Sequence, residues 1–482
     1  MQVPFTVSVE ALRRLGLSRP ARTWWAWAVV GAIAAAVVSS LGVWRWSAQG
    51  AAGEANAALQ VTSIPPGAVV EVDGRAGALT PADLTLAPGE HRVTVRREGY
   101  TDATYRVSAQ PGQTGIVAAD LWLRTPLAQR LRPTFPGATI ADADFLADGR
   151  VALTLTLPPG DEQQLWLIDT RGEARRLGPP DARGSLAVTP DGARVAYLAR
   201  GEGVRPGGAG LDEVWLSNQA GDWGVRSYVL PTASNGERLV DLSWAPDGQH
   251  LLVVSREPRA GGGLRTHLRW LDPTTGEASE LTTIPSEVVP SSYSWRPDSQ
   301  WVAFLARADQ ATSLCLLGTP SGEFRYLADL GRDDSGPLPF APLAWAPDGE
   351  RVVYSAPAQD RSGPPSWLFR GSPPLTLYAA DLSEAASRRL TDAPGQSPTW
   401  RLDGSIVALD RPKWDGDILL RAVDPSGDAR ELGPLPVEAA ATYAVRWDVP
   451  HAQAIVAVRR TGLVGGSGPS YWLVGFRAEG DR

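Results

Sequence analysis

The sequence predicts an all-β protein in which a single N-terminal transmembrane helix and a small β-sandwich precede a β-propeller. Three observations carry this prediction. A turn motif of the type Trp-x-Pro-Asp-Gly recurs along the chain, 50 Gly and 41 Pro supply many turns, and an uncharged apolar stretch lies near the N-terminus. A short unit that returns at intervals of about 43 to 56 residues is typical of propeller blades, each of which is a small antiparallel sheet.

The uncharged stretch runs from Thr23 to Trp44 and has the length of a transmembrane helix. Its 22 residues suffice for a bilayer core of about 30 Å at a rise of about 1.5 Å per residue. Tryptophans stand at both ends, and four arginines precede the stretch whereas only Arg45 follows it closely. The positive-inside rule therefore predicts a cytoplasmic N-terminus and places everything after residue 46 on the other side of the membrane.

A cleaved signal peptide is the alternative, because small-residue cleavage sites are present at 48–50 and 55–57. The apolar core is longer than that of a signal peptide, which favours an uncleaved, single-pass anchor in the cell membrane. We therefore expect the bulk of the chain to be extracytoplasmic. The expected division is a cytoplasmic tail (1–22), a transmembrane helix (23–46), a linker (47–57), a sandwich domain (58–125) and a propeller (126–482).

The sandwich is predicted from alternating strands separated by specific turns. The stretch from Leu59 to Leu123 contains a Pro-x-Gly-Ala opening, a Val-x-Val-Asp-Gly strand and turn, a Pro-Gly-x-His hairpin and a Gly-Tyr pair. These residues resemble the PEGA module, a small β-sandwich usually found outside the membrane in bacterial and archaeal proteins, although Pro66 replaces the Glu of its motif. The resemblance implies a spacer or adhesion module without catalytic residues. His91 lies on a strand without neighbouring metal ligands, so we expect no metal there.

The repeated motif that follows contains the residues that a tight turn requires. Pro presets φ, Asp bonds nearby backbone N–H groups and Gly adopts positive φ, so that each motif forms the turn between the first and second strands of a blade. The repeated aspartates are therefore expected to be structural. The motif copies begin at Phe145, Val188, Trp244, Trp295, Trp345, Trp400 and Trp447. They resemble TolB-like propeller repeats, which are related to WD-type repeats; this resemblance covers residues 127–477 and implies the fold without a function.

Closure of the ring is predicted from the two ends of the repeat region. The seventh unit stops after its third strand, at 471–476, while 127–132 precedes the first unit and looks like a fourth strand. Supplying the missing strand from the N-terminal side would leave no half-finished sheet. Seven blades are expected, with six or eight as alternatives because the first and last units are degenerate.

Loop lengths distinguish the two faces of the predicted propeller. One face carries only the tight motif turns, and the other carries the long insertions, at 201–211, 256–266, 333–342, 357–374 and 459–469. Binding residues favour loops on a rigid scaffold. The candidate binding residues are Trp367, Phe369 and Arg370 in the fifth blade's loop, together with Asp241, Tyr293 and Tyr443 near the long-loop ends of first strands. Alternatively, the loop aromatics fold onto the rim of their own blade.

Composition and motifs exclude several classes of function but do not identify a ligand. A net charge of −7 spread along the chain argues against nucleic acid as a partner. The sequence has no Gly-x-Ser-x-Gly elbow or phosphate-binding loop, and its four histidines are scattered, so no metal or cofactor is expected. We predict a non-enzymatic binding or scaffold protein that engages a protein, a peptide or an envelope polymer through its long-loop face. The alternatives are a lyase or hydrolase with convergent acidic or basic groups over the central channel, or a structural component of an envelope complex.

Overall fold

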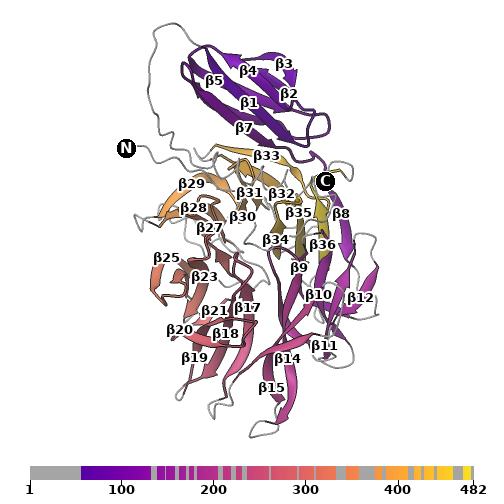
Figure 1. The fold of residues 1–482 in the computed structure, drawn as a ribbon, viewed down its shortest axis with the longest axis vertical. Helices are drawn as coiled ribbons and strands as arrows, with labels where there is room; N and C mark the ends of the chain where they lie inside the picture. The colour runs from indigo at the N-terminus through magenta and orange to yellow at the C-terminus, as the bar shows by residue number, and fades with distance from the viewer. Residues whose placement is uncertain are drawn as a thin grey trace, which may run out of the picture.

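The computed structural model describes most of the chain after residue 55. The described residues are 56–131, 138–146, 148–157, 162–169, 173–177, 182–204, 210–218, 224–230, 236–259, 262–289, 292–308, 311–332, 343–357, 375–382, 387–410, 417–424, 428–438, 442–459 and 470–478. All regular structure in these ranges is β-strand (Figure 1). No helix among them is long and apolar enough to cross a membrane, and the predicted helix at 23–46 lies outside them.

The first seven strands form a two-sheet sandwich. They are β1 (Ala57–Ile64), β2 (Val69–Val72), β3 (Arg75–Leu79), β4 (Ala82–Leu86), β5 (Gly89–Arg96), β6 (Ala103–Ala109) and β7 (Thr114–Asp120). Their orders are β4-β1-β7 and β3-β2-β5-β6, and only the β1–β7 pair is parallel. Asp73 and Gly74 adopt φ of 50° and 82°, which suits the tight hairpin between β2 and β3. Alternate residues such as Leu59 and Val61 face one core shared by both sheets.

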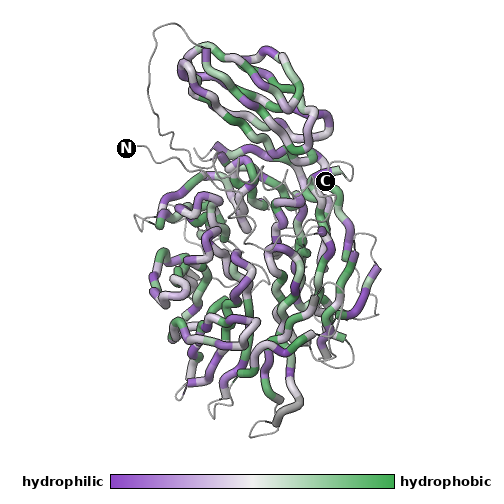
Figure 2. The backbone as a smooth tube through the Cα atoms, in the orientation of Figure 1, coloured by the Kyte–Doolittle hydropathy of each residue, from purple (hydrophilic) through white to green (hydrophobic). Residues whose placement is uncertain are grey.

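The strands after the sandwich form seven further sheets in the described part of the chain. The inner three strands of each sheet follow in chain order, and hydrophobic and hydrophilic residues alternate along many of them (Figure 2). Sheets one to three contain β9 (Thr139–Phe145), β10 (Val151–Leu157), β11 (Glu162–Ile168) and β12 (Ala174–Leu177); β13 (Ala182–Val188), β14 (Arg194–Val204), β15 (Gly210–Asn218) and β16 (Val225–Val229); and β17 (Arg238–Trp244), β18 (Leu251–Pro258), β19 (Leu264–Leu271) and β20 (Ala278–Ile284).

The remaining four sheets complete the series. Sheet four contains β21 (Glu287–Val288), β22 (Ser294–Trp295), β23 (Trp301–Ala308), β24 (Ala311–Gly318) and β25 (Phe324–Arg332); sheet five β26 (Leu343–Trp345), β27 (Arg351–Pro357), β28 (Leu375–Asp381) and β29 (Ser387–Pro394); sheet six β30 (Gln396–Trp400), β31 (Ile406–Asp410), β32 (Leu419–Val423) and β33 (Ala429–Pro434). Sheet seven contains β34 (Thr442–Asp448), β35 (Gln453–Arg459), β36 (Ser470–Gly475) and β8 (Leu127–Leu131).

Sheet seven shows how the two ends of the repeat region meet. β8 pairs with β36 in antiparallel register, with Leu127 opposite Gly475 and Leu131 opposite Tyr471. This pairing confirms the predicted supply of the last strand from the N-terminal side. Tyr471 also lies in one hydrophobic cluster with Val151 and Leu153 of sheet one. The last sheet therefore packs on the first, and the series of sheets closes on itself.

The motif turns behave as their chemistry predicts. In sheet five, Ala346 N–H donates to the Arg351 carbonyl and Gly349 N–H to the Ala346 carbonyl, at 2.8 and 2.9 Å. The Asp348 carboxylate accepts from Glu350 N–H at 2.9 Å, and Gly349 adopts a φ of 70°. The aspartate thus accepts a hydrogen bond from the backbone of its own turn. The equivalent aspartates of other sheets, for example Asp247 and Asp298, do the same.

Two predicted insertions are partly strand instead of loop. β18 continues to Pro258 and pairs directly with Leu264 of β19 across the stretch expected to be irregular. The hairpin turns at Gly262 and Gly263, whose φ of 98° and 85° suits glycine. β14 and β15 likewise extend to Val204 and from Gly210. Strand pairing therefore extends into the first and second of the predicted insertions, at 201–211 and 256–266.

The sandwich is fastened to the propeller through Trp122. The Trp122 side chain is fully buried in the core of sheets six and seven, and its ring stacks on Phe476 with centroids 4.4 Å apart. The Leu123 N–H donates to the Phe476 carbonyl at 2.8 Å. Figure 1 shows the sandwich at one end of the molecule, next to β33. The two units therefore share packed core residues.

Buried charges surround this contact, which we call the junction. Asp120 forms an ion pair with Arg477 at 2.6 Å, and the Trp122 indole N–H donates to Asp120 at 3.0 Å. The Arg401 guanidinium, 1% exposed, lies over the Trp122 ring at 5.1 Å. The Tyr105 hydroxyl donates to Asp403 in the motif turn of sheet six at 3.0 Å. The sandwich thus contacts the propeller on its tight-turn face.

Candidate binding site in the central channel

The inner strands of all seven sheets line one cavity of about 310 Å³. In every sheet the residue immediately before the motif contributes to its wall. Five of these positions carry small side chains, and two carry opposite charges. They are Asp144, Ala187, Ser243, Ser294, Ala344, Thr399 and Arg446. Because small residues stand at five of the seven positions, the axis of the ring is open. Asp144 and Arg446 are the only charged residues among these seven.

Arg446 connects the last inner strand to the first. Its Nη1 lies 3.3 Å from Asp144 Oδ1, and its Nη2 lies 3.9 Å from Asp142 Oδ1. Its side chain is 24% exposed, whereas that of Asp142 is 5% exposed. The guanidinium is therefore held between two carboxylates of sheet one and still reaches the cavity.

The two aspartates of β9 also reach the neighbouring inner strand. Asp142 Oδ2 accepts from Leu186 N–H at 3.1 Å, and Asp144 Oδ2 accepts from Val188 N–H at 3.0 Å. An inner strand is the edge of its sheet and has N–H groups without a strand partner. The carboxylates satisfy these groups on β13 and so have a structural role, which Asp144 combines with lining the channel.

Asp241 and Tyr293, both predicted as binding residues, lie next to each other on sheets three and four. The Ser185 hydroxyl and the Leu242 N–H both donate to the buried Asp241 carboxylate. The Tyr293 ring belongs to the wall of the cavity. Its inner strand is interrupted: β21 and β22 pair separately with β23, and Ser292 between them accepts from Leu305 N–H at 3.1 Å. Such irregularities re-aim side chains next to functional sites.

Burial raises the pKa values of Asp142 and Tyr293. The pKa of Asp142 rises to about 7 because the side chain is buried. The guanidinium of Arg446 and the N–H groups of Leu186 and Ala143 lower this pKa, and the negative charge of Asp241 raises it. Burial, and then the negative charge of Asp241, holds the pKa of Tyr293 well above its usual range. The channel wall therefore contains a neutral phenol and a guanidinium, and a buried carboxyl with a pKa of about 7 lies behind the guanidinium.

Replacing Asp142 with asparagine should flatten the pH dependence of stability. Between about pH 4 and 7 the folded protein keeps a proton that the unfolded chain has lost, so wild-type stability falls as pH rises, by up to about 1.4 kcal/mol per pH unit. Asp142→Asn keeps an acceptor for Leu186 and removes this contribution. The measurement is urea unfolding across this pH range.

Asp191 provides the matched control for that experiment. Burial alone would raise its pKa, but hydrogen bonds from the Thr189 hydroxyl and Ala193 N–H lower it. Asp191→Asn should therefore remove stability that is present above the ordinary pKa of an aspartate, the opposite direction. Identical pH profiles for Asp142→Asn and wild type would contradict the assignment.

The other predicted site residues remain predictions. Tyr443 lies on β34, where its backbone pairs with Val458. Trp367, Phe369 and Arg370 lie outside the described residues. Sequence reasoning missed Asp144, Ser185 and Arg446. The signal for Asp144 and Arg446 was available, because both occupy the position immediately before the repeated motif, where the other sheets have small residues.

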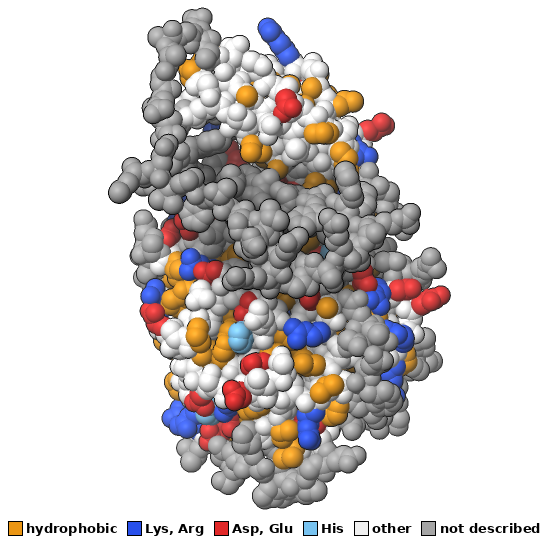
Figure 3. All heavy atoms as spheres, in the orientation of Figure 1, with side chains coloured by type: hydrophobic (Ala, Val, Ile, Leu, Met, Phe, Trp, Pro, Cys, Tyr) orange, Lys and Arg blue, Asp and Glu red, His pale blue; other side chains and the backbone are white. Residues whose placement is uncertain are grey.

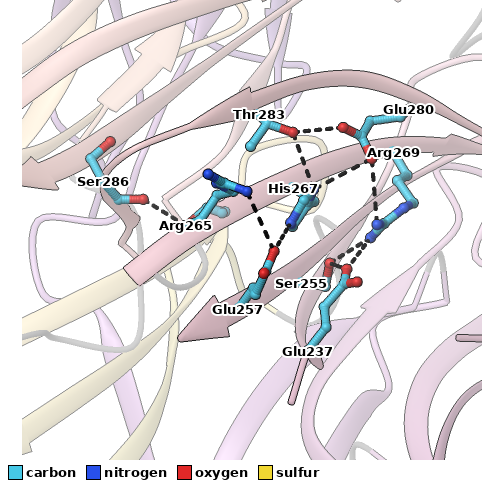
Figure 4. Close-up of polar contacts among 10 residues, drawn as sticks. Glu237, Ser255, Glu257, Arg265, His267, Arg269, Glu280, Thr283 and Ser286 are labelled. Carbon is cyan, nitrogen blue, oxygen red and sulfur yellow. Dashed lines mark hydrogen bonds and ion pairs between the residues drawn. The ribbon is translucent and has the colours of Figure 1, made fainter. Parts of the chain in front are cut away.

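A second polar cluster lies on the long-loop side of sheet three (Figure 4). His267 contacts Glu257 at 3.0 Å and Thr283 at 3.1 Å. Arg269 contacts Glu237 at 2.7 Å. No group of three or more metal-ligating side chains occurs among the described residues. Positive and negative groups pair with each other here, so the cluster joins adjacent strands of one sheet.

The sandwich can now be compared with known families. Residues 57–122 match the PEGA domain family. The resemblance predicted from the sequence is thereby confirmed for this part of the chain. The PEGA domain occupies the two sheets formed by β1–β7, and its last matched residue is Trp122, the residue that inserts into the propeller. A comparison with curated proteins found no match.

Solved structures resemble the propeller. An oligogalacturonate lyase in complex with manganese superposes with a TM-score of 0.50 at 16% identity, over 73% of this chain and 94% of the lyase. A puromycin-hydrolyzing peptidase from Mycobacterium tuberculosis has a TM-score of 0.48 at 16% identity, over 67% of this chain and 50% of the peptidase. TolB from Acinetobacter baumannii has a TM-score of 0.34 at 14% identity, over 71% of this chain and 80% of TolB.

The likeness to the lyase agrees with the all-β fold of the seven sheets and corrects one prediction. The prediction that the protein is not an enzyme is wrong as a conclusion from the fold, because the structures that resemble it include a lyase with a TM-score of 0.50. At 16% identity the likeness extends to the fold alone. The channel residues of this chain, and not its architecture, must therefore carry any functional argument.

Proposed function

We propose that the chain is a membrane-anchored, extracytoplasmic binding or scaffold protein with a seven-bladed propeller. Residues 23–46 span the cell membrane, residues 47–57 form a tether, and the domains occupy 58–125 and 126–482. The propeller engages a protein, a peptide or an envelope polymer. On the side of the molecule drawn in Figure 3, basic and acidic side chains are interspersed over the propeller, in keeping with a partner other than nucleic acid.

One observation supports the long-loop face as the binding face. The PEGA domain contacts the motif turn of sheet six through the hydrogen bond from Tyr105 to Asp403. Its Asp120 also pairs with Arg477, which donates to the Pro450 carbonyl in the turn of sheet seven at 3.1 Å. Part of the tight-turn face is thus covered by the PEGA domain. A partner would approach from the opposite face, toward the level of Asp142 and Asp241.

Capture of the partner tests this function. The double variant Asp144→Asn/Arg446→Gln removes both cavity charges and keeps a polar side chain at each position. We expect it to recover at least about tenfold less partner by crosslinking from membranes, the loss that 1.4 kcal/mol of binding energy produces. The matched control is Glu323→Gln/Arg325→Gln, an ion pair on sheet four with both side chains about half exposed. Unchanged partner recovery by both variants would exclude the channel as the binding site.

Labelling tests the location. Val225 is 71% exposed on β16, whereas the sole cysteine, Cys315, is fully buried and burial raises the pKa of its thiol to about 12. Val225→Cys should react with a membrane-impermeant maleimide on intact cells whose envelope admits the reagent. Wild type should stay unlabelled. Labelling of Val225→Cys only after lysis would contradict an extracytoplasmic propeller.

An enzyme that acts in the channel is the second candidate. An enzyme would need convergent acidic or basic groups there, and Asp142, Asp241, Tyr293 and Arg446 lie close together beside the channel. A carboxyl with a pKa of about 7 can act as an acid or a base near neutral pH, and a guanidinium can stabilise negative charge. Turnover of an envelope polymer that is lost in Asp142→Asn, with the fold retained, would favour this candidate.

A further inference from the structure

The PEGA domain joins the rest of the chain through two adjacent strands. β1 is the strand that follows the proposed tether, and β7 leads directly into the junction. The two strands are parallel and in register, from Ala58 opposite Thr114 to Ile64 opposite Asp120. The chain therefore enters the domain at one end of this ladder and leaves it at the other end.

This arrangement determines how the domain meets a pulling force. A force that draws the tether away from the junction acts along the strands, in opposite directions on β1 and β7. The hydrogen bonds of the pair run between the strands and lie across that direction, so all of them carry the force together. A force applied to an edge strand at right angles would open its ladder one hydrogen bond after another.

Further contacts strengthen the ladder at both ends and on its other side. Ala58 N–H donates to the Gln113 carbonyl at 2.7 Å, and Leu121 N–H donates to the Ile64 carbonyl at 2.8 Å. β1 also pairs with β4 and is therefore held along both of its edges. Leu59 is fully buried in the domain core, so sliding of β1 would have to pull close-packed side chains out of place.

Force leaving β7 enters the propeller without crossing a flexible linker. Asp120 ends β7 and is paired with Arg477, and Trp122 is packed between sheets six and seven. The Leu123 N–H is bonded to the Phe476 carbonyl. The load is thus passed from the parallel ladder to the buried core of the propeller within a few residues.

We propose that the PEGA domain is a mechanical clamp that carries tension between the membrane tether and a partner held by the propeller. Its biological setting rests on the proposed membrane anchorage. The mechanical property itself depends only on the β1–β7 ladder and the junction, and it can be measured without a membrane.

Force spectroscopy on the full chain tests the clamp, with handles attached to introduced cysteines. One handle is placed at Leu127→Cys, a half-exposed position just after the junction. The second is placed at Asn56→Cys, before β1, or in the matched control at Leu79→Cys, an exposed position at the end of the edge strand β3. The buried Cys315 should not react.

We expect the domain to unfold at a force at least about twofold higher when it is pulled from residue 56 than from residue 79, because forced unfolding depends on the unfolding barrier along the loaded direction. Urea unfolding should give the two cysteine variants the same stability. An equal or lower force from residue 56 would overturn the proposal. Failure of the cell-labelling experiment would reject the anchorage and leave this result unaffected.

Discussion

Trp122→Ala is expected to destabilise the propeller as well as the PEGA domain, by about 3 to 5 kcal/mol. The substitution removes a fully buried ring from the core of sheets six and seven and leaves a cavity beside Phe476. It also removes the ring under the buried Arg401 guanidinium. The measurement is urea unfolding followed by fluorescence, with limited proteolysis to identify the sheets that open first.

Tyr326→Ala is the control for this substitution. Tyr326 is 65% exposed on the outer strand of sheet four, so its loss should change the free energy of unfolding by no more than about 0.5 kcal/mol. Early proteolysis confined to the PEGA domain in Trp122→Ala would show that the two units do not depend on each other. The shared core described for the junction would then be wrong.

Asp120→Ala is expected to cost about 3 to 5 kcal/mol, because it removes one partner of a buried ion pair and leaves Arg477 uncompensated. Asp392→Ala is the control: Asp392 is 94% exposed and pairs with Arg389 on the surface, and such pairs contribute at most about 1 kcal/mol. Asp120 also accepts from Trp122. The double variant Asp120→Ala/Trp122→Ala should therefore lose less stability than the sum of the single variants, and strict additivity would contradict the contact.

Local sequence signals predicted the fold well because they act through neighbouring residues. The motif turns depend on Pro, Asp and Gly within one short stretch, as at Ala346–Gly349. The PEGA-like hairpins depend in the same way on pairs such as Asp73 and Gly74. The closing strand could be inferred by counting strands, and the structure pairs it as expected.

The site was harder to predict because its residues meet across the ring. Arg446 and Asp144 belong to the last and first sheets, and no local pattern links them. Trp122 looked like the end of the PEGA pattern, although it belongs to the propeller core. The interruption before Tyr293 and the hairpin at Pro258 also depend on pairing with neighbouring strands. Of the residues predicted from the ends of inner strands, Tyr293 lines the cavity and Asp241 lies beside it; their role in binding stays a prediction.

The shared last sheet also has a consequence for the order of events during synthesis. β8 is made before all other propeller strands, yet its partner β36 follows far later, as the contact between Arg130 and Ser470, 340 residues apart, shows. The PEGA strands can pair as soon as they emerge, whereas β8 has an unpaired edge until the last sheet has been made. That interval is when the nascent chain is most exposed to mispairing and aggregation, and it ends when the two ends of the propeller meet.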